Sequence, residues 1–262
     1  MNPRSAAAAP FVTIMQTRID NFTMGEVLLQ IEKLVADPEP SHIITANVDH
    51  LMIKHKYPDD NEIYRRAVLV VPDGVPLLWA ARFLGTPLQE RINGTDLMEK
   101  TCKLAAKRNF SVFLLGSPAG IAERAARNLQ KQFPGLVVSG VYAPECGFEK
   151  DPRENEKICA MLQETRPDIL FVSLGIPKGI LWIDRYQREG GIALAMEVGA
   201  SFSFISGDLK RAPRWMQTNG LEWLWRLILE PRRLWKRYLC NDLPFFFHLV
   251  KEKYFARKPG KP

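Results

Sequence analysis

The sequence predicts an α/β fold: a Rossmann-like, mostly parallel sheet covered by helices, followed by a basic, aromatic-rich helical appendage. Between Ser41 and Val198, short apolar runs alternate with amphipathic segments of helical length. Runs such as VLVV, VFLL and ILFV are apolar at consecutive positions, which is typical of strands covered on both faces. From residue 206 the composition changes. We therefore expect an α/β core at residues 1–209 and the appendage at residues 210–262.

The expected elements alternate between strand and helix along the chain. Residues 1–9 are rich in alanine and are expected to fray. A first strand is expected at Phe11–Met15, and a helix at Asn21–Asp37, where apolar residues form a stripe. The strands of the sheet are expected at 41–46, 67–71, 111–115, 136–142, 169–174 and 192–198. A helix is expected to begin at Asn47, and two others to span 94–107 and 154–165. The helices that follow the strands 111–115 and 169–174 are expected to end near residues 132 and 188.

A carboxylate stands at one predicted strand end. The apolar run Ala67–Val71 ends at Pro72, and Asp73 and Gly74 precede the next helical segment. Ligands of open α/β sheets bind at the carboxyl ends of strands, so Asp73 is placed to act as a general base in a partly desolvated site. Asp is also a common helix cap and Asp-Gly a common turn, and the motif alone leaves both interpretations open.

A turn of small residues follows the run 111–115. Gly116-Ser117-Pro118-Ala119-Gly120 leads into a helix that is expected to hold the proline in its first turn, where free backbone N–H groups and the helix dipole favour an anion. The chain lacks GxGxxG and GxxxxGK[ST], so it has neither a dinucleotide fingerprint nor a P-loop. A tight turn that binds no ligand is the alternative.

Positive charge is concentrated at the C-terminus. Residues 210–262 contain 13 Lys/Arg and four Asp/Glu, whereas the rest of the chain contains 23 and 25, and the net charge is +7. Basic residues interleaved with Trp and Phe on short amphipathic segments suit a membrane interface. Packing of these aromatics on the core is equally compatible with the pattern. No known recognition module accompanies the basic residues, so we expect no nucleic-acid binding.

The cysteine and histidine spacing argues against a metal site, and the apolar segments argue against secretion. Cys102, Cys146, Cys159 and Cys240 show no CxxC spacing, and the four histidines do not cluster with them, so a zinc site is not expected. No strand–helix junction carries Asp-x-Asp, and Asp59-Asp60 is expected in a solvated loop. The first 23 residues lack the apolar core of a secretory signal, and no apolar run is long enough to cross a bilayer. We expect a cytoplasmic protein with reduced thiols.

Several motifs stand in a fixed order along the chain. They are Thr45-Ala46-Asn47, Pro72-Asp73-Gly74, Arg91 to Leu97 (RINGTDL), Phe113 to Ser117 (FLLGS), Gly175 to Lys178 (GIPK), Arg211 to Gln217 (RAPRWMQ), Gly220 to Trp223 (GLEW) and Glu230 to Arg233 (EPRR). Together they resemble the bacterial WecG/TagA/CpsF glycosyltransferase family over about Pro10 to Leu239.

The resemblance implies an inverting, metal-independent glycosyltransferase without a cofactor. It would move a hexose or N-acetylhexosamine from a UDP-sugar to a saccharide on a polyprenyl-pyrophosphate carrier at the inner face of the plasma membrane. Asp73 matches the family's proposed catalytic base. Three arginines of the appendage, Arg226, Arg233 and Arg237, are implied to close over the site, and Lys236 is the alternative to Arg237. The residues implied to bind substrate are Thr45, Asn47, Arg91, Asn93, Gly116, Ser117, Gly175, Lys178, Arg226, Arg233 and Arg237.

One departure from the family pattern affects the donor. The family reads G-x-P-x-Q-E where this chain has Gly179 and Ile180 at the last two positions. N-acetylmannosamine is the family's best-known sugar, and the departure favours UDP-glucose and exopolysaccharide assembly instead. Two other classes are weighed: a sugar-nucleotide epimerase or dehydrogenase, disfavoured by the missing GxGxxG, and a non-catalytic nucleotide-binding membrane adaptor. Family members self-associate, so a homo-oligomer is expected.

Overall fold

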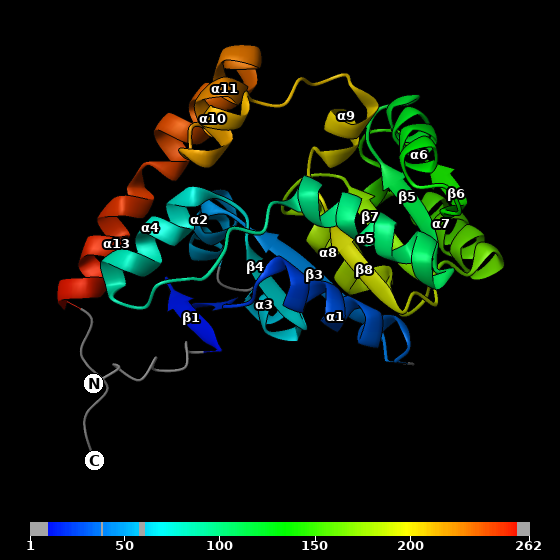
Figure 1. Ribbon diagram of the computed structural model, residues 1–262, viewed down its shortest axis with the longest axis horizontal. Helices are drawn as coiled ribbons and strands as arrows, with labels where there is room; N and C mark the ends of the chain where they lie inside the picture. Colours follow the sequence, from blue (N-terminus) through cyan, green and yellow to red (C-terminus); the bar gives the residue numbers. More distant parts are fainter. Residues whose placement is uncertain (1–9, 38, 58–60, 256–262) are drawn as a thin grey trace.

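A parallel sheet forms the centre of the molecule (Figure 1). The computed structural model describes residues 10–37, 39–57 and 61–255, and over this part of the chain six strands form one sheet in the order β4-β3-β8-β7-β5-β6. All the neighbouring pairs are parallel, which confirms the predicted α/β class. The strands are β3 (Ser41–Ala46), β4 (Leu69–Pro72), β5 (Ser111–Gly116), β6 (Val137–Tyr142), β7 (Ile169–Ser173) and β8 (Leu194–Glu197).

Helices cover both faces of this sheet. One face packs on α1 (Met24–Val35), α5 (Gly94–Arg108), α6 (Ile121–Gln132) and α9 (Ser201–Ser206). The other packs on α2 (Val48–Lys56), α3 (Asn61–Arg66), α4 (Val75–Leu84), α7 (Pro152–Thr165) and α8 (Lys178–Tyr186). Because side chains of a strand alternate between the faces, the consecutive apolar residues of each run fill both cores.

The strand order decides where a ligand can bind. After β4 the chain crosses to β5 on the far side of the sheet, and it returns through β7 to place β8 between β7 and β3. Ile44 of β3 consequently lies opposite both Val70 of β4 and Glu197 of β8. The carboxyl ends of these strands, which are far apart in sequence, meet at the topological switch point of the sheet, where crevices form in such folds.

Three expectations from the sequence were incomplete or wrong. The first strand, β1 (Phe11–Ile14), pairs antiparallel with an unexpected β2 (Thr17–Asp20), whose alternation is only four residues long. The short helices α3 and α9 were also missed. The helix after β5 begins at Ile121, behind a left-handed Gly120, so Pro118 lies in the turn and not in the first helical turn. The expectations for residues 1–9 and Asp59-Asp60 lie outside the described residues.

The C-terminal segment forms a chain of short helices along one side of the molecule (Figure 1). They are α10 (Arg214–Thr218), α11 (Glu222–Leu229), α12 (Pro231–Lys236), the π-helical turn η3 (Arg237–Asp242) and α13 (Pro244–Phe255). The last helix packs on α2 and α4, with Phe245 and Leu249 buried. Within the described residues no helix is both long and apolar enough to span a membrane.

The side chains of this segment divide into two sets, and its binding to a membrane stays a prediction. One side of the segment packs back on the core through Met216, Leu234, Phe245 and Leu249. The other leaves large apolar side chains exposed: Trp215, Trp223, Ile228, Leu229, Trp235, Leu243, Phe246, Phe247, Val250, Tyr254 and Phe255.

The packing of α13 yields a matched pair of variants. Phe245→Ala removes a side chain that is 0% exposed and should lower the free energy of unfolding by about 3–5 kcal/mol. Phe247→Ala, two residues on and 70% exposed, should change it by less than about 0.5 kcal/mol. Urea denaturation of the full chain measures both. Equal losses would contradict the described orientation of α13.

Candidate active site

Asp73 begins the site at the end of β4. Its backbone N–H donates to the Ala46 carbonyl at 2.7 Å, which ties the turn to the end of β3. Gly74 follows at a φ of 131°, a conformation open to glycine, and α4 starts at the next residue without a side-chain cap. The cap interpretation of Asp73 is therefore wrong, and its carboxylate faces the start of another helix.

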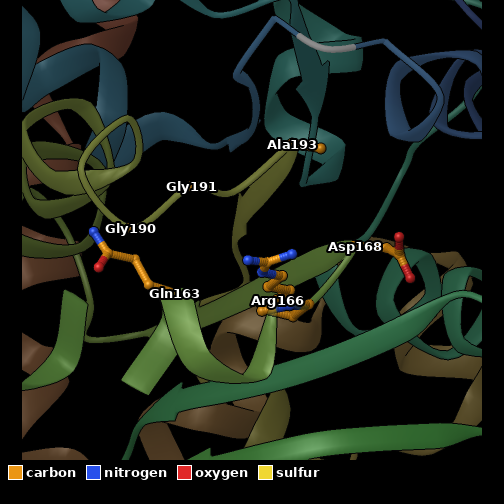
Figure 2. A pocket seen from close by; sticks show the side chains of 7 residues that line it. Gln163, Arg166, Asp168, Gly190, Gly191 and Ala193 are labelled. Atoms are coloured by element: carbon orange, nitrogen blue, oxygen red, sulfur yellow. The ribbon is translucent and has the colours of Figure 1, made fainter. Parts of the chain in front are cut away.

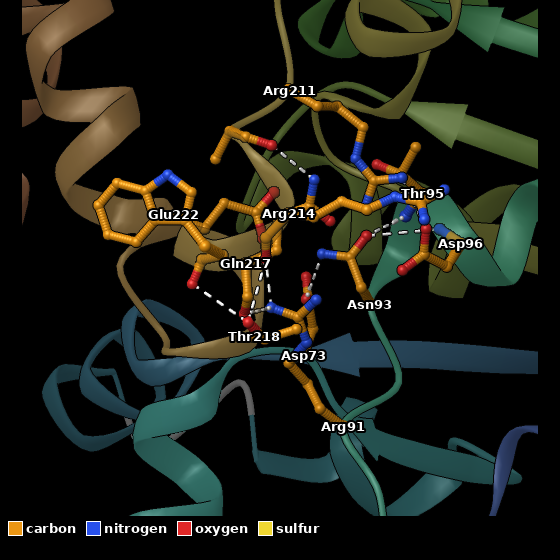
Figure 3. A network of polar contacts seen from close by, with 12 residues as sticks. Asp73, Arg91, Asn93, Thr95, Asp96, Arg211, Arg214, Gln217, Thr218 and Glu222 are labelled. Carbon is orange, nitrogen blue, oxygen red and sulfur yellow. Dashed lines mark hydrogen bonds and ion pairs between the residues drawn. The ribbon is translucent and has the colours of Figure 1, made fainter.

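Asn93 holds the Asp73 carboxylate in place (Figure 3). The Asn93 Oδ1 accepts from the backbone N–H of Thr95 at 2.9 Å, so the side chain caps α5. This fixes the orientation of the amide, and its Nδ2 donates to Asp73 Oδ1 at 3.1 Å. The Gly94 backbone N–H also donates to the carboxylate. One residue thus begins the helix and aligns the acid.

The surroundings of Asp73 bring its titration close to neutral pH. Burial raises the pKa of Asp73 to about 7, and the Glu222 carboxylate adds to the rise. The Arg91 guanidinium, the Gly94 N–H and the Arg226 guanidinium act in the opposite direction. The residue as a whole is partly buried. A carboxyl group that titrates near the working pH is suited to accept a proton from a substrate.

Four arginines near this region are paired with acids. The pairs are Arg91 with Glu222 at 3.2 Å, Arg211 with Asp96 at 2.6 Å, Arg226 with Glu230 at 3.3 Å and Arg237 with Asp49 at 2.9 Å. Three of these arginines, at positions 211, 226 and 237, come from the C-terminal segment. The side chain of Arg233 lies outside the described residues.

Thr45 and Asn47 lie at the end of β3, beside the Asp73 turn. A Cβ atom added at Gly94 would lie 3.3 Å from Thr45 Oγ1 and 3.8 Å from Asp73 Oδ2, so both side chains flank the start of α5. Thr45 Oγ1 itself donates to the Glu197 carbonyl at 3.3 Å. Asn47 accepts from the His50 backbone N–H at 3.3 Å and caps α2. The structure gives Asn47 a structural role; substrate contact by either residue remains a prediction.

Some groups of the turns at residues 116–120 and 175–178 form contacts within the protein, and anion binding at these turns stays a prediction. The Ser117 N–H donates to the Ser173 carbonyl at 2.9 Å, so it is not a free donor as the sequence suggested. A Cβ atom at Gly116 would lie 2.6 Å from that carbonyl oxygen, which explains why glycine stands there. The Gly175 N–H donates to the Glu197 carboxylate, and Lys178 pairs with Glu149.

Glu197 is a site residue that the sequence analysis missed. It ends β8, is 2% exposed, and accepts from the Gly199 N–H at 3.0 Å through Oε1. Burial raises its pKa to about 7, the Gly199 and Gly175 N–H groups oppose the rise, and the Asp73 charge adds to it. A single acid inside the apolar run IALAMEV was the available signal.

Glu197 also explains the departure at position 179. A Cβ atom added at Gly179 would lie 2.5 Å from Glu197 Cγ, closer than real Cβ contacts allow. The volume of a side chain on the first turn of α8 is therefore filled by an acid from β8.

A hollow at the opposite edge of the sheet is separate from this site. It measures about 460 Å³ and lies at the amino ends of β7 and β8, between Gln163, Arg166, Asp168 and the loop Gly190–Ala193 (Figure 2). Asp168 there is engaged in holding the Ser111 N–H and hydroxyl. Nowhere in the described part of the chain, this hollow included, is a group of three or more His, Cys, Asp or Glu arranged to hold a metal ion.

A near-neutral carboxyl group with paired arginines, at the switch point of a parallel sheet, is typical of an enzyme active site. Comparison with known proteins gives the family. The model of the Glycosyl transferase WecG/TagA/CpsF family matches residues 12–259, and the chain belongs to this family. It is therefore a glycosyltransferase, and a purely non-catalytic adaptor is not supported.

Three relatives carry the name N-acetylglucosaminyldiphosphoundecaprenol N-acetyl-beta-D-mannosaminyltransferase. The protein of Bacillus spizizenii is 33% identical over 198 residues, covering 75% of this chain and 74% of the relative. That of Bacillus subtilis is 30% identical over 247 residues, covering 92% and 93%. That of Staphylococcus aureus is 27% identical over 241 residues, covering 91% of each. These names give no support to the expected preference for UDP-glucose or to exopolysaccharide assembly.

The contact between positions 179 and 197 can be tested by a double-mutant cycle. Gly179→Ala should lower the free energy of unfolding by about 1–3 kcal/mol, because the new methyl group overlaps Glu197. In a Glu197→Ala background the same change should be neutral or stabilising, as alanine is in most helices. Denaturant titration of the four proteins measures the coupling. An equal effect of Gly179→Ala in both backgrounds would show that Glu197 does not fill this space.

Proposed function

We propose that this enzyme transfers N-acetylmannosamine from a UDP-sugar to an N-acetylglucosaminyl-diphosphate on a polyprenyl carrier, with inversion and without a metal, in cell-surface polysaccharide synthesis. The observation that carries the proposal is the Asp73 carboxyl group, aligned by Asn93 and titrating near neutrality at the sheet's switch point. The named relatives support the choice of sugar and acceptor. Glucose as the donor sugar is the alternative that the assay below separates.

The reaction is a single displacement at the anomeric carbon. Asp73 takes the proton of the acceptor hydroxyl while the oxygen of that hydroxyl forms a bond to the anomeric carbon. The bond from the anomeric carbon to the UDP oxygen breaks at the same time, and its electron pair goes to UDP. Attack from the side opposite to UDP inverts the configuration, so an α-linked donor gives a β-linked product. The transition state has oxocarbenium character, as in other glycosyl transfers.

Charge on the protein would stabilise the departing UDP. Arg91, Arg226 and Arg237 are each paired with an acid, and a diphosphate can bind the guanidinium N–H groups that these acids leave free. Because burial limits the solvation of these guanidinium groups, an anionic ligand restores favourable contacts. The arginines of the C-terminal segment therefore bind the donor in this proposal, and Arg233, Thr45 and Asn47 remain further predicted contacts.

We infer that the C-terminal segment also binds the inner face of the plasma membrane, where the lipid-linked acceptor lies. Exposed aromatic and aliphatic side chains stand beside basic residues on α11, α12 and α13. Each Lys or Arg near an anionic leaflet contributes about 1 kcal/mol, so several together give reversible attachment. A homo-oligomer, the absence of nucleic-acid binding and the division at residue 209 stay predictions.

The transfer assay tests the proposed reaction. With EDTA present, wild-type protein should transfer radiolabel from UDP-N-acetylmannosamine to a polyprenyl-diphosphate N-acetylglucosamine, and UDP-glucose should be a poor donor. Asp73→Asn should lose activity by about 100-fold or more, because an amide cannot take the proton. Asp37→Asn, an exposed loop change, is the matched control. Full activity of Asp73→Asn would remove Asp73 from the mechanism, and EDTA-sensitive transfer would contradict the metal-free reaction.

Membrane attachment can be measured by flotation with vesicles that contain phosphatidylglycerol. Trp235→Ala combined with Phe247→Ala removes side chains that are 51% and 70% exposed and should weaken binding by about tenfold. Leu29→Ala, which is 60% exposed on α1, is the control. High salt should also release the wild type, because it screens the basic residues. Unchanged flotation of the double variant would assign attachment to another surface.

A further inference from the structure

Glu222 connects the C-terminal segment to the candidate active site. It is the first residue of α11, its side chain is 17% exposed, and its Oε2 lies 3.2 Å from Nη1 of Arg91 (Figure 3). Arg91 belongs to the core, in the connection between α4 and α5, and its own side chain is 18% exposed. A negatively charged side chain in the first turn of a helix interacts favourably with the helix dipole, even when it is exposed. Here it is largely covered and paired across the junction.

Backbone packing fixes the position of Glu222. The Gln217 carbonyl lies 3.5 Å from the same Arg91 nitrogen, so two groups of the segment hold one edge of the guanidinium. Gly220 has a φ of 73°, and a Cβ atom there would lie 2.8 Å from the Cβ of Val75. The segment therefore approaches the start of α4 as closely as a backbone can, two residues beyond Asp73. A side chain at position 220 would move Glu222 away.

Glu222 and Arg91 act on Asp73 with opposite sign. The Glu222 charge raises the pKa of Asp73, whereas Arg91 lowers it. The other groups that face Asp73 are the Asn93 amide, the Gly94 N–H, Arg226 and the Glu197 carboxyl. Burial is the largest cause of the raised pKa, and Glu222 is the next. Of these groups, Glu222 and Arg226 belong to the C-terminal segment.

We propose that Glu222 is a positioning residue of the transfer site: it holds one edge of the Arg91 guanidinium and keeps negative charge beside Asp73 while the C-terminal segment is docked on the core. A guanidinium has five N–H donors, so the edge that Glu222 and Gln217 leave open can bind the donor diphosphate. In the docked arrangement the Glu222 charge opposes ionisation of Asp73, whereas the Arg226 charge favours it. This inference deepens the proposed function and rests on it.

Titration of Asp73 in the full chain tests the inference without substrate. Protein labelled with ¹³C at aspartate carboxyl carbons is followed by NMR against pH, and Asp73→Asn assigns the resonance. Glu222→Gln keeps the shape and removes the charge, so the Asp73 midpoint should fall by about one pH unit. Glu62→Gln, which removes an exposed acid paired within α3, should leave the midpoint unchanged. An unchanged midpoint in folded Glu222→Gln would overturn the inference.

Kinetics separate this inference from the proposed reaction. Glu222→Gln should raise the KM for the donor several-fold and lower kcat, because Arg91 loses its anchor and Asp73 becomes a weaker base. A midpoint shift in protein that transfers no sugar would uphold the electrostatic role of Glu222 and refute the proposed function. Transfer by wild type with unchanged kinetics in Glu222→Gln would overturn the positioning role. Thermal unfolding of each variant verifies that it is folded.

Discussion

Desolvation of the Asp73 carboxyl group is the constraint on which the rest of the site depends. A carboxylate taken out of water is destabilised unless other groups replace its hydration, and otherwise it holds its proton. Here the Asn93 amide and the Gly94 N–H supply part of that replacement. Both belong to the start of α5, so the helix that covers one face of the sheet also determines the direction of the acid. Because desolvation outweighs these favourable contacts, the Asp73 carboxyl group can take and release a proton near neutral pH.

The same principle organises the positive charges. An arginine left unpaired in a covered site would be unfavourable, and each one described around Asp73 has an acidic partner. A diphosphate, like a carboxylate, presents oxygen atoms that a guanidinium can bind through two N–H groups. The C-terminal segment contributes both arginines and acids to the arrangement. Under the proposed function, its attachment to the core and its exposed apolar side chains would link catalysis to the membrane surface that holds the lipid-linked acceptor.

The sequence was sufficient for the sheet and insufficient for the details of the site. The buried strands could be predicted because apolar runs such as Ile169–Ser173 are covered on both faces. The strand β2 was missed because four alternating residues carry little signal. Asp73 was found from its place after a strand, but its partners Asn93 and Glu222 depend on contacts between distant segments. Gly179 was interpreted as a sign of a different donor sugar, and only the packing reveals that a side chain there would overlap Glu197.

The pH dependence of kcat/KM for sugar transfer tests the central claim most directly. Asp73 must be deprotonated to act as the base, and its pKa is raised to about 7. The account therefore predicts that kcat/KM rises about tenfold per pH unit below neutrality and levels off above it. Repulsion between the charges of Asp73 and Glu197, whose pKa is also about 7, would spread this rise over a wider pH range. A rate that stays constant from about pH 5 to 8 would mean that the base titrates like an ordinary exposed carboxylate, and would contradict the account.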